Sequence, residues 1–587
     1  MKSAILLFTM LLLLVSSAFA QDMTFVLKQS GDSLWVKDDA DFSGQNTLYS
    51  LMNSDSLAPA SRVYVLHNGG VYSIVNNSTG SANHQTIIMG ETNTSLKTST
   101  GGAPPVLQGA VYPGGSSTGG MNSGGDLLVK NCDIEIGNSA GGIGWGFFGF
   151  AGASMRIQVD NCIIEHNLWT VVGGPPAHSR IYFNNDYFVN LDGHTCRRNG
   201  GVLDFFSDQD TISVQNCTHV NVQGSSWKSR PDYIIKKILF NHNDFINCSG
   251  FVMMNSGADK PNFSVTNNIF VNVQLQGFAP PIALVDVGEV DPDNLPMGLV
   301  NLKPDSVFLA NGGSFYADKN LVYWDPSLSN IVTTLNSGNG VDGSKQWVSQ
   351  MIEMNSRTAA VVADKATYPK VNVLGWIENT KPTFKKTDVL FTTGLATLKT
   401  FSIATVDTTF TGSLASWRQA TNLETDFFTY ADWPIPIDLS YTDASLLTAG
   451  MGGFPIGDLG WFPAAQYASW KAQESTELAH IQNVLNTGQL TAVRTTEQLP
   501  QKFQLGQNYP NPFNPSTVIS YSIAKAGNVT LKVYNMLGQE VATLVNGYQA
   551  ASSYDVNFNA SSLSSGVYLY ELRTGSNAII KKMVLMK

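Results

Sequence analysis

The chain has 587 residues, of which only 14% are charged and 53 are glycine, and its formal net charge is −10. This length exceeds one ordinary globular domain, although repeat proteins can grow by adding similar units. The acidic balance argues against nucleic acid as a partner, because a phosphate backbone requires a basic protein face. It favours neutral or cationic partners only weakly.

The first twenty residues have the pattern of a secretory signal peptide. Lys2 supplies the positive start, Ile5 to Val15 form the apolar run, and Ala18-Phe19-Ala20 form a small-residue cleavage site. The run is too short to span a bilayer, and no later segment qualifies. We therefore expect residues 1–20 to be removed, and the mature chain to pass through the periplasm without a transmembrane segment.

Residues 127–272 contain several copies of one short motif, in which alternating apolar residues are followed by Asn. Residues 157–162 read Ile-Gln-Val-Asp-Asn-Cys, and residues 212–217 read Ile-Ser-Val-Gln-Asn-Cys. The alternation indicates β-strands, and a spacing of roughly 24 to 31 residues between copies is typical of a solenoid. The recurring position carries Asn131, Asn161, Asn185, Asn216, His242 and Asn267.

These repeats predict an all-β chain that begins with a right-handed parallel β-helix. One coil cannot bury its apolar face alone, so successive coils must stack and share a core. Asn tolerates left-handed backbone, and stacked turns would align the asparagines as an amide ladder. The alternative is an antiparallel β-sandwich with accidental internal similarity. We assign residues 21–330 to the β-helix and residues 331–486 to its C-terminal part or cap.

Three of the five cysteines fit this arrangement as buried free thiols rather than disulfides, whereas Cys196 and Cys248 lie elsewhere and cannot be paired from sequence. Cys132, Cys162 and Cys217 occupy equivalent positions of different repeats, directly after the recurring Asn. Stacked coils would therefore bury them beside the amide ladder. Near the far end of this region, residues 452–463 are expected to be structural, with Gly turns and with Trp461 and Phe462 closing the core.

The last eighty-five residues or so contain the most distinctive motifs. Residues 508–515 read Asn-Tyr-Pro-Asn-Pro-Phe-Asn-Pro, residues 537–541 read Leu-Gly-Gln-Glu-Val, and residues 565–570 read Ser-Gly-Val-Tyr-Leu-Tyr. Over residues 503–587 these blocks resemble the C-terminal sorting domain of type IX secretion cargo, in its type A form. Residues 487–502 would then be a polar linker.

This resemblance implies a small C-terminal β-sandwich that the type IX secretion machinery recognises at the outer membrane. The protein would accordingly be secreted or held on the outer cell surface. Apolar alternation between Gly, Asn and Ser turns independently predicts short antiparallel strands in this region. An accessory adhesion or matrix-binding β-sandwich is the alternative.

The N-terminal strands offer a looser resemblance. Short strands such as Arg62–Leu66 and Thr86–Gly90, within residues 24–110, resemble the opening coils of pectate-lyase-like β-helix proteins, which include secreted polysaccharide lyases. The similarity rests on the rhythm of the strands, and no catalytic motif of that family is present. It implies carbohydrate as the class of ligand.

The longest excursion of each repeat leaves from a similar point, so these excursions should stack along one side of the solenoid. Aromatic rings beside cations suit carbohydrate, because sugar C–H groups pack on rings and cations pair with carboxylates or sulfates. The alternative is that the rings form local loop cores and the cations are solvated. The predicted substrate-binding residues are Trp145, Trp169 and Trp227, and the nearby cations are Arg197, Arg198, Lys228 and Arg230.

A lyase acting on an acidic polysaccharide needs a cation to neutralise the uronate carboxylate and a base to remove the neighbouring proton. The four cationic residues are therefore the candidate catalytic residues. Ca²⁺ is the candidate cofactor, because Asp204, Asp208 and Asp210 offer hard oxygen ligands. Asp and Ser in such positions are also common turn residues.

The sequence gives less support to a hydrolase or to a zinc site. A pectinase-type hydrolase would need paired carboxylates on adjacent strands, where the repeats show Asn and Cys. No His or Cys spacing suggests zinc. The sequence therefore favours a secreted or cell-surface β-helix protein that binds extracellular polysaccharide, with lyase-like cleavage if it is an enzyme. The alternative is a non-enzymatic surface adhesin or structural protein.

Overall fold

The computed structural model describes most of the chain between Met23 and Lys587. The signal peptide predicted at residues 1–20 lies outside the described residues. The described ranges are 23–41, 46–55, 58–74, 85–92, 94–109, 120–135, 144–150, 152–165, 167–191, 193–194, 199–222, 225–229, 233–248, 253–255, 262–273, 298–304, 308, 312–328, 352–387, 433–490, 503–508, 510–525, 527–549, 552–575 and 577–587.

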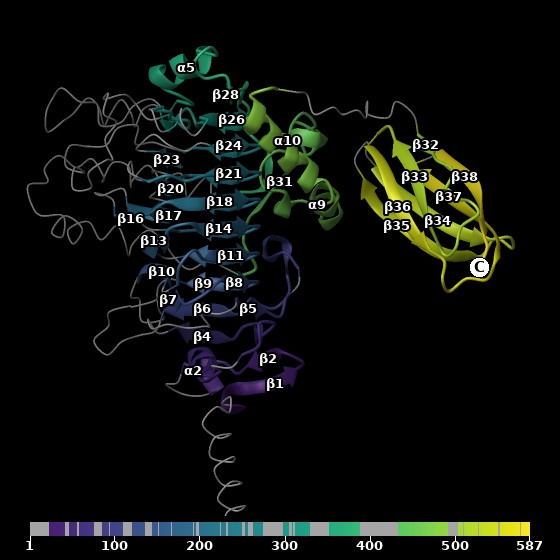
Figure 1. Cartoon of the computed structure of the whole chain (residues 1–587), viewed down its shortest axis with the longest axis horizontal. Helices are drawn as coiled ribbons and strands as arrows, with labels where there is room; N and C mark the ends of the chain where they lie inside the picture. Colours follow the sequence, from purple (N-terminus) through teal and green to yellow (C-terminus); the bar gives the residue numbers. More distant parts are fainter. Residues whose placement is uncertain are drawn as a thin grey trace, which may run out of the picture. The chain divides into compact units, whose positions relative to one another are not determined.

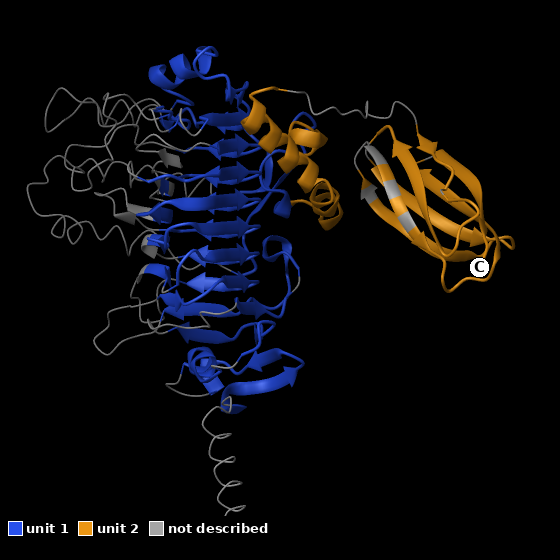
Figure 2. Ribbon diagram, in the orientation of Figure 1, with its two compact units in different colours: residues 1–446, 456–461 blue, residues 447–455, 462–587 orange. Residues whose placement is uncertain are grey.

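The chain divides into two compact units, which Figure 2 colours separately. The first unit is a parallel β-helix whose successive coils stack as a column of strands (Figure 1). Each complete coil adds a strand to a first, a second and a third sheet in turn, which we call sheets A, B and C. The antiparallel β-sandwich alternative for residues 127–272 is therefore wrong, because these strands pair in parallel.

The strands of sheet A follow one another in chain order. They are β1 (Val26–Ser30), β2 (Ser33–Val36), β3 (Val63–Leu66), β5 (Thr86–Gly90), β8 (Leu127–Lys130), β11 (Arg156–Asp160), β14 (Ser179–Asn184), β18 (Gln209–Gln215), β21 (Ile238–Asn241), β24 (Asn262–Thr266), β26 (Ser314–Asp318) and β28 (Val371–Val373). Among these described strands of sheet A, β1 and β2 are the only neighbours that pair antiparallel.

Sheets B and C complete each coil. Sheet B contains β4 (Val71–Ile74), β6 (Val106–Gly109), β9 (Asp133–Glu135), β12 (Ile163–Glu165), β15 (Tyr187–Val189), β19 (Thr218–Val220), β22 (Asp244–Ile246), β25 (Ile269–Val271), β27 (Leu321–Tyr323) and β29 (Ile377–Glu378). Sheet C contains β7 (Met121–Ser123), β10 (Gly144–Phe150), β13 (Asn167–Gly173), β17 (Asn199–Phe205), β20 (Ser225–Ser229) and β23 (Met253–Asn255), with β16 (Gly193–His194) antiparallel to β17. The parallel sheets thus continue into residues 331–486.

Shorter elements accompany the coils of the first unit. Its helices are η1 (Met23–Phe25), η2 (Asp39–Asp41), α2 (Thr47–Ser54), η3 (Leu96–Thr98), α5 (Ser356–Ala363) and η7 (Leu459–Trp461). The N-terminus of α5 is capped by Asn355, whose side chain accepts a hydrogen bond from the backbone N–H of Thr358. An antiparallel pair, β30 (Phe384–Lys386) with β31 (Asp438–Tyr441), lies outside the three sheets.

The turn between sheets A and B explains the recurring Asn. All six predicted positions have left-handed backbone, with φ between 55° and 60°, and His242 occupies one of them at 55°. Asn adopts this conformation more readily than most residues because its short side chain bonds locally. The amide of Asn161 donates to the side-chain oxygen of Asn131 at 2.8 Å, and that of Asn185 donates to Asn161 at 3.0 Å. The predicted amide ladder is therefore confirmed from Asn131 through Asn161 to Asn185.

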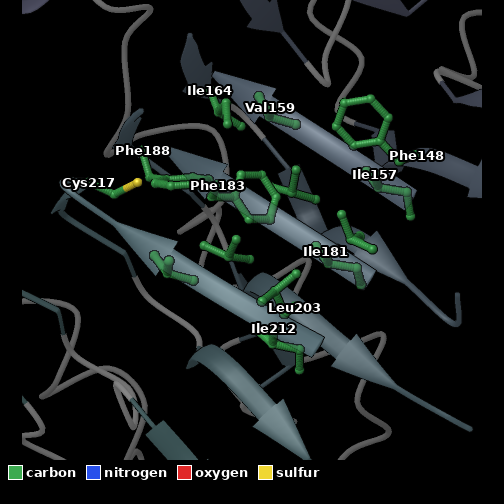
Figure 3. Close-up of a cluster of buried hydrophobic side chains, with 14 of the residues drawn as sticks. Phe148, Ile157, Val159, Ile164, Ile181, Phe183, Phe188, Leu203, Ile212 and Cys217 are labelled. Carbon is green, nitrogen blue, oxygen red and sulfur yellow. The ribbon is translucent and has the colours of Figure 1, made fainter. Parts of the chain in front are cut away.

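The core of the β-helix is filled by side chains that point inward from all three sheets. Figure 3 shows Ile157 from sheet A, Ile164 from sheet B and Phe148 from sheet C sharing this interior. Sheet B also contributes a stack in which the ring of His219 lies between Phe188 and Phe245, with centroid distances of 4.5 and 4.4 Å. Burial of each such side chain contributes about 1.5–3 kcal/mol.

The structure describes four of the cysteines as buried free thiols, which confirms the prediction for Cys132, Cys162 and Cys217. Cys132, Cys162, Cys217 and Cys248 form no disulfide and are at most 1% exposed. Burial raises their thiol pKa values, that of Cys248 to about 12. Thiols of this kind are poor nucleophiles because little thiolate is present at neutral pH.

Two segments distant in sequence cover the turn that carries the ladder. The backbone N–H of Leu96 donates to the side-chain oxygen of Asn161, and that of Leu459 donates to Asn216. The segments meet where the Lys97 ammonium group pairs with the Asp458 carboxylate, with both side chains buried. The 456–461 segment is therefore structural, as predicted, but it contacts the outside of the coils.

The contacts of Trp461 also place the 456–461 segment on the outside of the coils. Its indole N–H donates to the hydroxyl of Thr218 at 2.7 Å, and its ring meets that of Tyr187 edge-on at 5.9 Å. Thr218 and Tyr187 are register partners on sheet B. They alternate with the inward-facing Phe188 and His219, so they face outward. The 456–461 segment thus lies against the outer face of sheet B.

The second unit contains η6 (Met451–Gly453), α9 (Ala464–Lys471), α10 (Glu474–Thr487) and a C-terminal β-sandwich. One sheet of the sandwich pairs β32 (Gln504–Leu505), β33 (Ser516–Ile523) and β36 (Ser552–Asn559). The other orders β35 (Glu540–Gln549), β34 (Gly527–Asn535), β37 (Gly566–Thr574) and β38 (Asn577–Leu585). Their pairing is antiparallel, and both sheets contribute to one core.

The Asn- and Pro-rich block of residues 508–515 joins the two sheets of this sandwich. The Asn508 side chain donates to Thr517, while its backbone N–H donates to the hydroxyl of Tyr570 at 2.9 Å. Phe513 is buried in the shared core, and its backbone N–H donates to the carbonyl of Val584. The block is thus a structural part of the domain.

Candidate functional site

Sheet C is the part of the β-helix to which most of the predicted site residues belong. Trp145 lies on β10, Trp169 on β13 and Trp227 on β20, and these strands belong to one continuous parallel sheet. The backbone of Trp227 pairs in register with Leu203, and the side chains of the three tryptophans lie outside the described part. The segments that carry Arg197, Arg198 and Arg230 also lie outside it.

Asp204 and Lys228 are the two predicted residues that the structure brings together on this sheet. They are direct register partners on β17 and β20, and each is only 3% exposed. Parallel neighbours on one sheet face project in the same direction. An acidic and a basic group are thus buried side by side in adjacent coils.

Asp208 and Asp210 have different surroundings. The Asp208 carboxylate accepts a hydrogen bond from the backbone N–H of Ile234 at 2.8 Å, as turn aspartates commonly do. Asp210 lies on β18 of sheet A, where Lys236 and His178 contact its carboxylate at 2.8 and 3.3 Å. The hydrogen bond from Lys236, more than any other contact, holds the pKa of Asp210 below its usual value.

The carboxylate oxygens of Asp208 and Asp210 do not lie close enough to those of Asp204 to form a group that could hold one metal ion. Within the described ranges, three carboxylates converge at another place, formed by Asp133, Glu135 and Glu165 on sheet B. The assignment of Ca²⁺ to Asp204, Asp208 and Asp210 stays a prediction.

The three carboxylates of sheet B were not predicted from the sequence, although the repeat itself places two of them opposite each other. Aligning residues 131–135 with residues 161–165 by their Asn-Cys pairs places Glu135 opposite Glu165. The register of β9 and β12 has this same pairing. The paired carboxylates on adjacent strands that were sought for a hydrolase are therefore present, but on sheet B and away from the predicted residues.

Comparison with known proteins identifies the C-terminal sandwich. Residues 507–586 match the family described as "Secretion system C-terminal sorting domain". This match supports the predicted type IX secretion cargo, and with it export to the cell surface or the medium. No curated protein and no solved structure matches the chain. Among the described helices, none has both the length and the apolar character that crossing a bilayer requires.

Proposed function

We propose that this type IX secretion cargo binds extracellular polysaccharide along sheet C of its β-helix. The observation that carries the proposal is the common sheet of β10, β13, β17 and β20, to which Trp145, Trp169 and Trp227 belong. Neighbouring strands are about 4.8 Å apart, so these four coils extend over roughly 14 Å. Such a repeating surface suits an extended polymer better than a compact ligand.

The export route supports the same ligand class. A protein sent to the cell surface or the medium meets polymers of the cell envelope and of the surroundings. Aromatic rings can bind the apolar faces of their sugar rings, and Arg197, Arg198 and Arg230 can pair with acidic groups. A pectate-lyase-like cleavage extends this proposal, with the three arginines neutralising a uronate carboxylate, while Lys228 is buried beside Asp204.

The binding test uses affinity electrophoresis of the mature chain in gels that contain alginate, pectate or a glycosaminoglycan. Retardation by at least one polymer is expected, and Trp169→Ala and Trp227→Ala should reduce it. The matched control is Trp35→Ala, which removes a partly exposed ring from sheet A, where Lys28 lies 4.6 Å from the ring centroid. Equal loss in the control, or no retardation at all, would reject binding at sheet C.

Cleavage is measured separately, by the ultraviolet absorbance of the unsaturated product that a lyase forms. Product formation that Arg197→Ala abolishes would support the lyase. Retained binding without product, with and without added Ca²⁺, would instead support a non-enzymatic adhesin or structural protein.

A further inference from the structure

The outer face of sheet B carries three acidic residues whose positions follow from strand geometry. Asp133 and Glu135 flank the inward-facing Ile134 on β9, so both project outward. Glu165 on β12 follows the inward-facing Ile164, and it is the direct register partner of Glu135. One oxygen from each of the three carboxylates lies within 4.8 Å of the other two.

Burial distinguishes this cluster from a solvated acidic patch. Glu165 is fully buried, Asp133 is 9% exposed, and Glu135 keeps partial contact with solvent. The Oδ1 atom of Asp133 is buried and has no hydrogen-bond partner among the described residues. A buried oxygen of this kind costs free energy unless it finds a partner.

The described surroundings supply no compensating positive charge to two of the three acids. Neither Asp133 nor Glu135 forms an ion pair with a described Lys, Arg or His. Burial, with the charges of Glu165 and Glu135 adding to it, raises the pKa of Asp133 well above its ordinary value. Burial likewise raises the pKa of Glu135 to about 7. Protons or a bound cation would neutralise Asp133 and Glu135.

We propose that Asp133, Glu135 and Glu165 form a binding site for one Ca²⁺ ion. Three carboxylates offer the hard oxygen ligands that Ca²⁺ prefers, and no described thiol or imidazole joins them. A Ca²⁺–oxygen distance of about 2.4 Å lets one ion contact three oxygens that are about 4.2 Å from one another. The three ligand atoms here lie within 4.8 Å of one another, which is close to that spacing.

The site links two consecutive coils of the β-helix, because Asp133 and Glu135 come from β9 and Glu165 comes from β12. It lies on a different sheet from the predicted polysaccharide-binding residues. The bound ion therefore stabilises the stack of coils, and its loss leaves the residues of sheet C in place. The inference does not depend on the proposed function.

The test uses the mature chain after treatment with a chelator and its removal. Calorimetric titration with CaCl₂ at pH 8 should show one site, and thermal unfolding should move to higher temperature as Ca²⁺ is added. Glu135→Gln and Glu165→Gln should each weaken Ca²⁺ binding on the order of tenfold or more, because each removes a charged ligand. Glu378→Gln, at an exposed position on β29 of the same sheet, is the control and should bind as the unaltered chain does.

Two control variants complete the test. Asp204→Asn and Asp210→Asn should leave Ca²⁺ binding unchanged. The proposal is overturned by the absence of calorimetric binding at millimolar Ca²⁺, or by binding that the Asp204 or Asp210 variant abolishes and the Glu135 variant does not. Glu135→Gln keeps the test decisive if Glu165→Gln does not fold.

Discussion

Lys97 and Asp458 are 361 residues apart in the chain, yet their side chains form an ion pair in which neither is more than 1% exposed. The Lys97 ammonium group also donates to the backbone carbonyl of Asn216 at 2.7 Å and to the side chain of Asn185 at 3.3 Å. Asp458 in turn accepts from Thr218 and from the backbone N–H of Gly460, both at 2.7 Å. The pair thus connects the N-terminal coils, the ladder turn and the 456–461 segment.

Replacing Lys97 with Met should destabilise the β-helix by about 3–5 kcal/mol, because it leaves a buried acid without its counter-charge. Lys130→Met is the matched control, since the Lys130–Asp160 pair has side-chain exposures of 37% and 24% and should contribute at most about 1 kcal/mol. Urea unfolding of the two variants measures the difference. Equal destabilisation in both would contradict a special role for the buried pair.

The amide ladder predicts a similar contrast between two asparagines. Asn161→Ala should cost about 2–5 kcal/mol, because it loses the hydrogen bonds to Asn131 and Thr94 and also places Ala in left-handed backbone. The exposed Asn379 has the same backbone conformation, at φ 57°. Asn379→Ala should therefore cost only the conformational part, about 1–2 kcal/mol. Thermal unfolding compares the two, and a larger loss at Asn379 would contradict the ladder's contribution.

His219 predicts a specific dependence of stability on pH. Burial, reinforced by the charge of Lys97, lowers the pKa of His219 to about 3, from 6.5 for an exposed imidazole. Below about pH 6 the unfolded chain binds a proton that the folded chain does not, so folding loses up to about 1.4 kcal/mol per pH unit down to about pH 3. Above the unfolded pKa both states are neutral, and this contribution is constant.

His219→Phe keeps an aromatic ring between Phe188 and Phe245 and removes the titrating group. The free energy of unfolding of the variant should therefore fall less steeply between pH 6 and pH 4 than that of the unaltered chain. Between pH 7 and pH 8 the two slopes should agree. Equal slopes over the acidic range would show that the imidazole titrates in the folded state.

Deleting residues 503–587 should leave the protein in the periplasm. The sorting domain is the part that matches the secretion family, and its sandwich has a hydrophobic core of its own. Immunoblots of periplasmic, surface and medium fractions would locate the truncated chain beside the full-length chain. Normal appearance of the truncated chain outside the cell would refute the sorting assignment.

Local pattern was sufficient to predict the repeat. The Asn-Cys pairs at 161–162 and 216–217 mark a turn whose conformation depends on its own residues. The Asn has left-handed backbone, and the side chain after it points inward. Alternation in Ile157 and Val159 identified the strands for the same reason. The sorting domain was likewise predictable, because its short motifs lie within consecutive strands and turns of one small sandwich.

Contacts between distant segments were decided only by the tertiary structure. Nothing near Lys97 in sequence indicates its partner Asp458, and nothing near Glu165 indicates that it is fully buried. Strand alternation predicts that Asp133, Glu135 and Tyr187 face outward, where solvent is expected. Burial of that outer face depends on other parts of the chain, such as the 456–461 segment beside Tyr187. Periodicity reports how a residue points along its own strand, whereas charge burial depends on which other segment covers that strand.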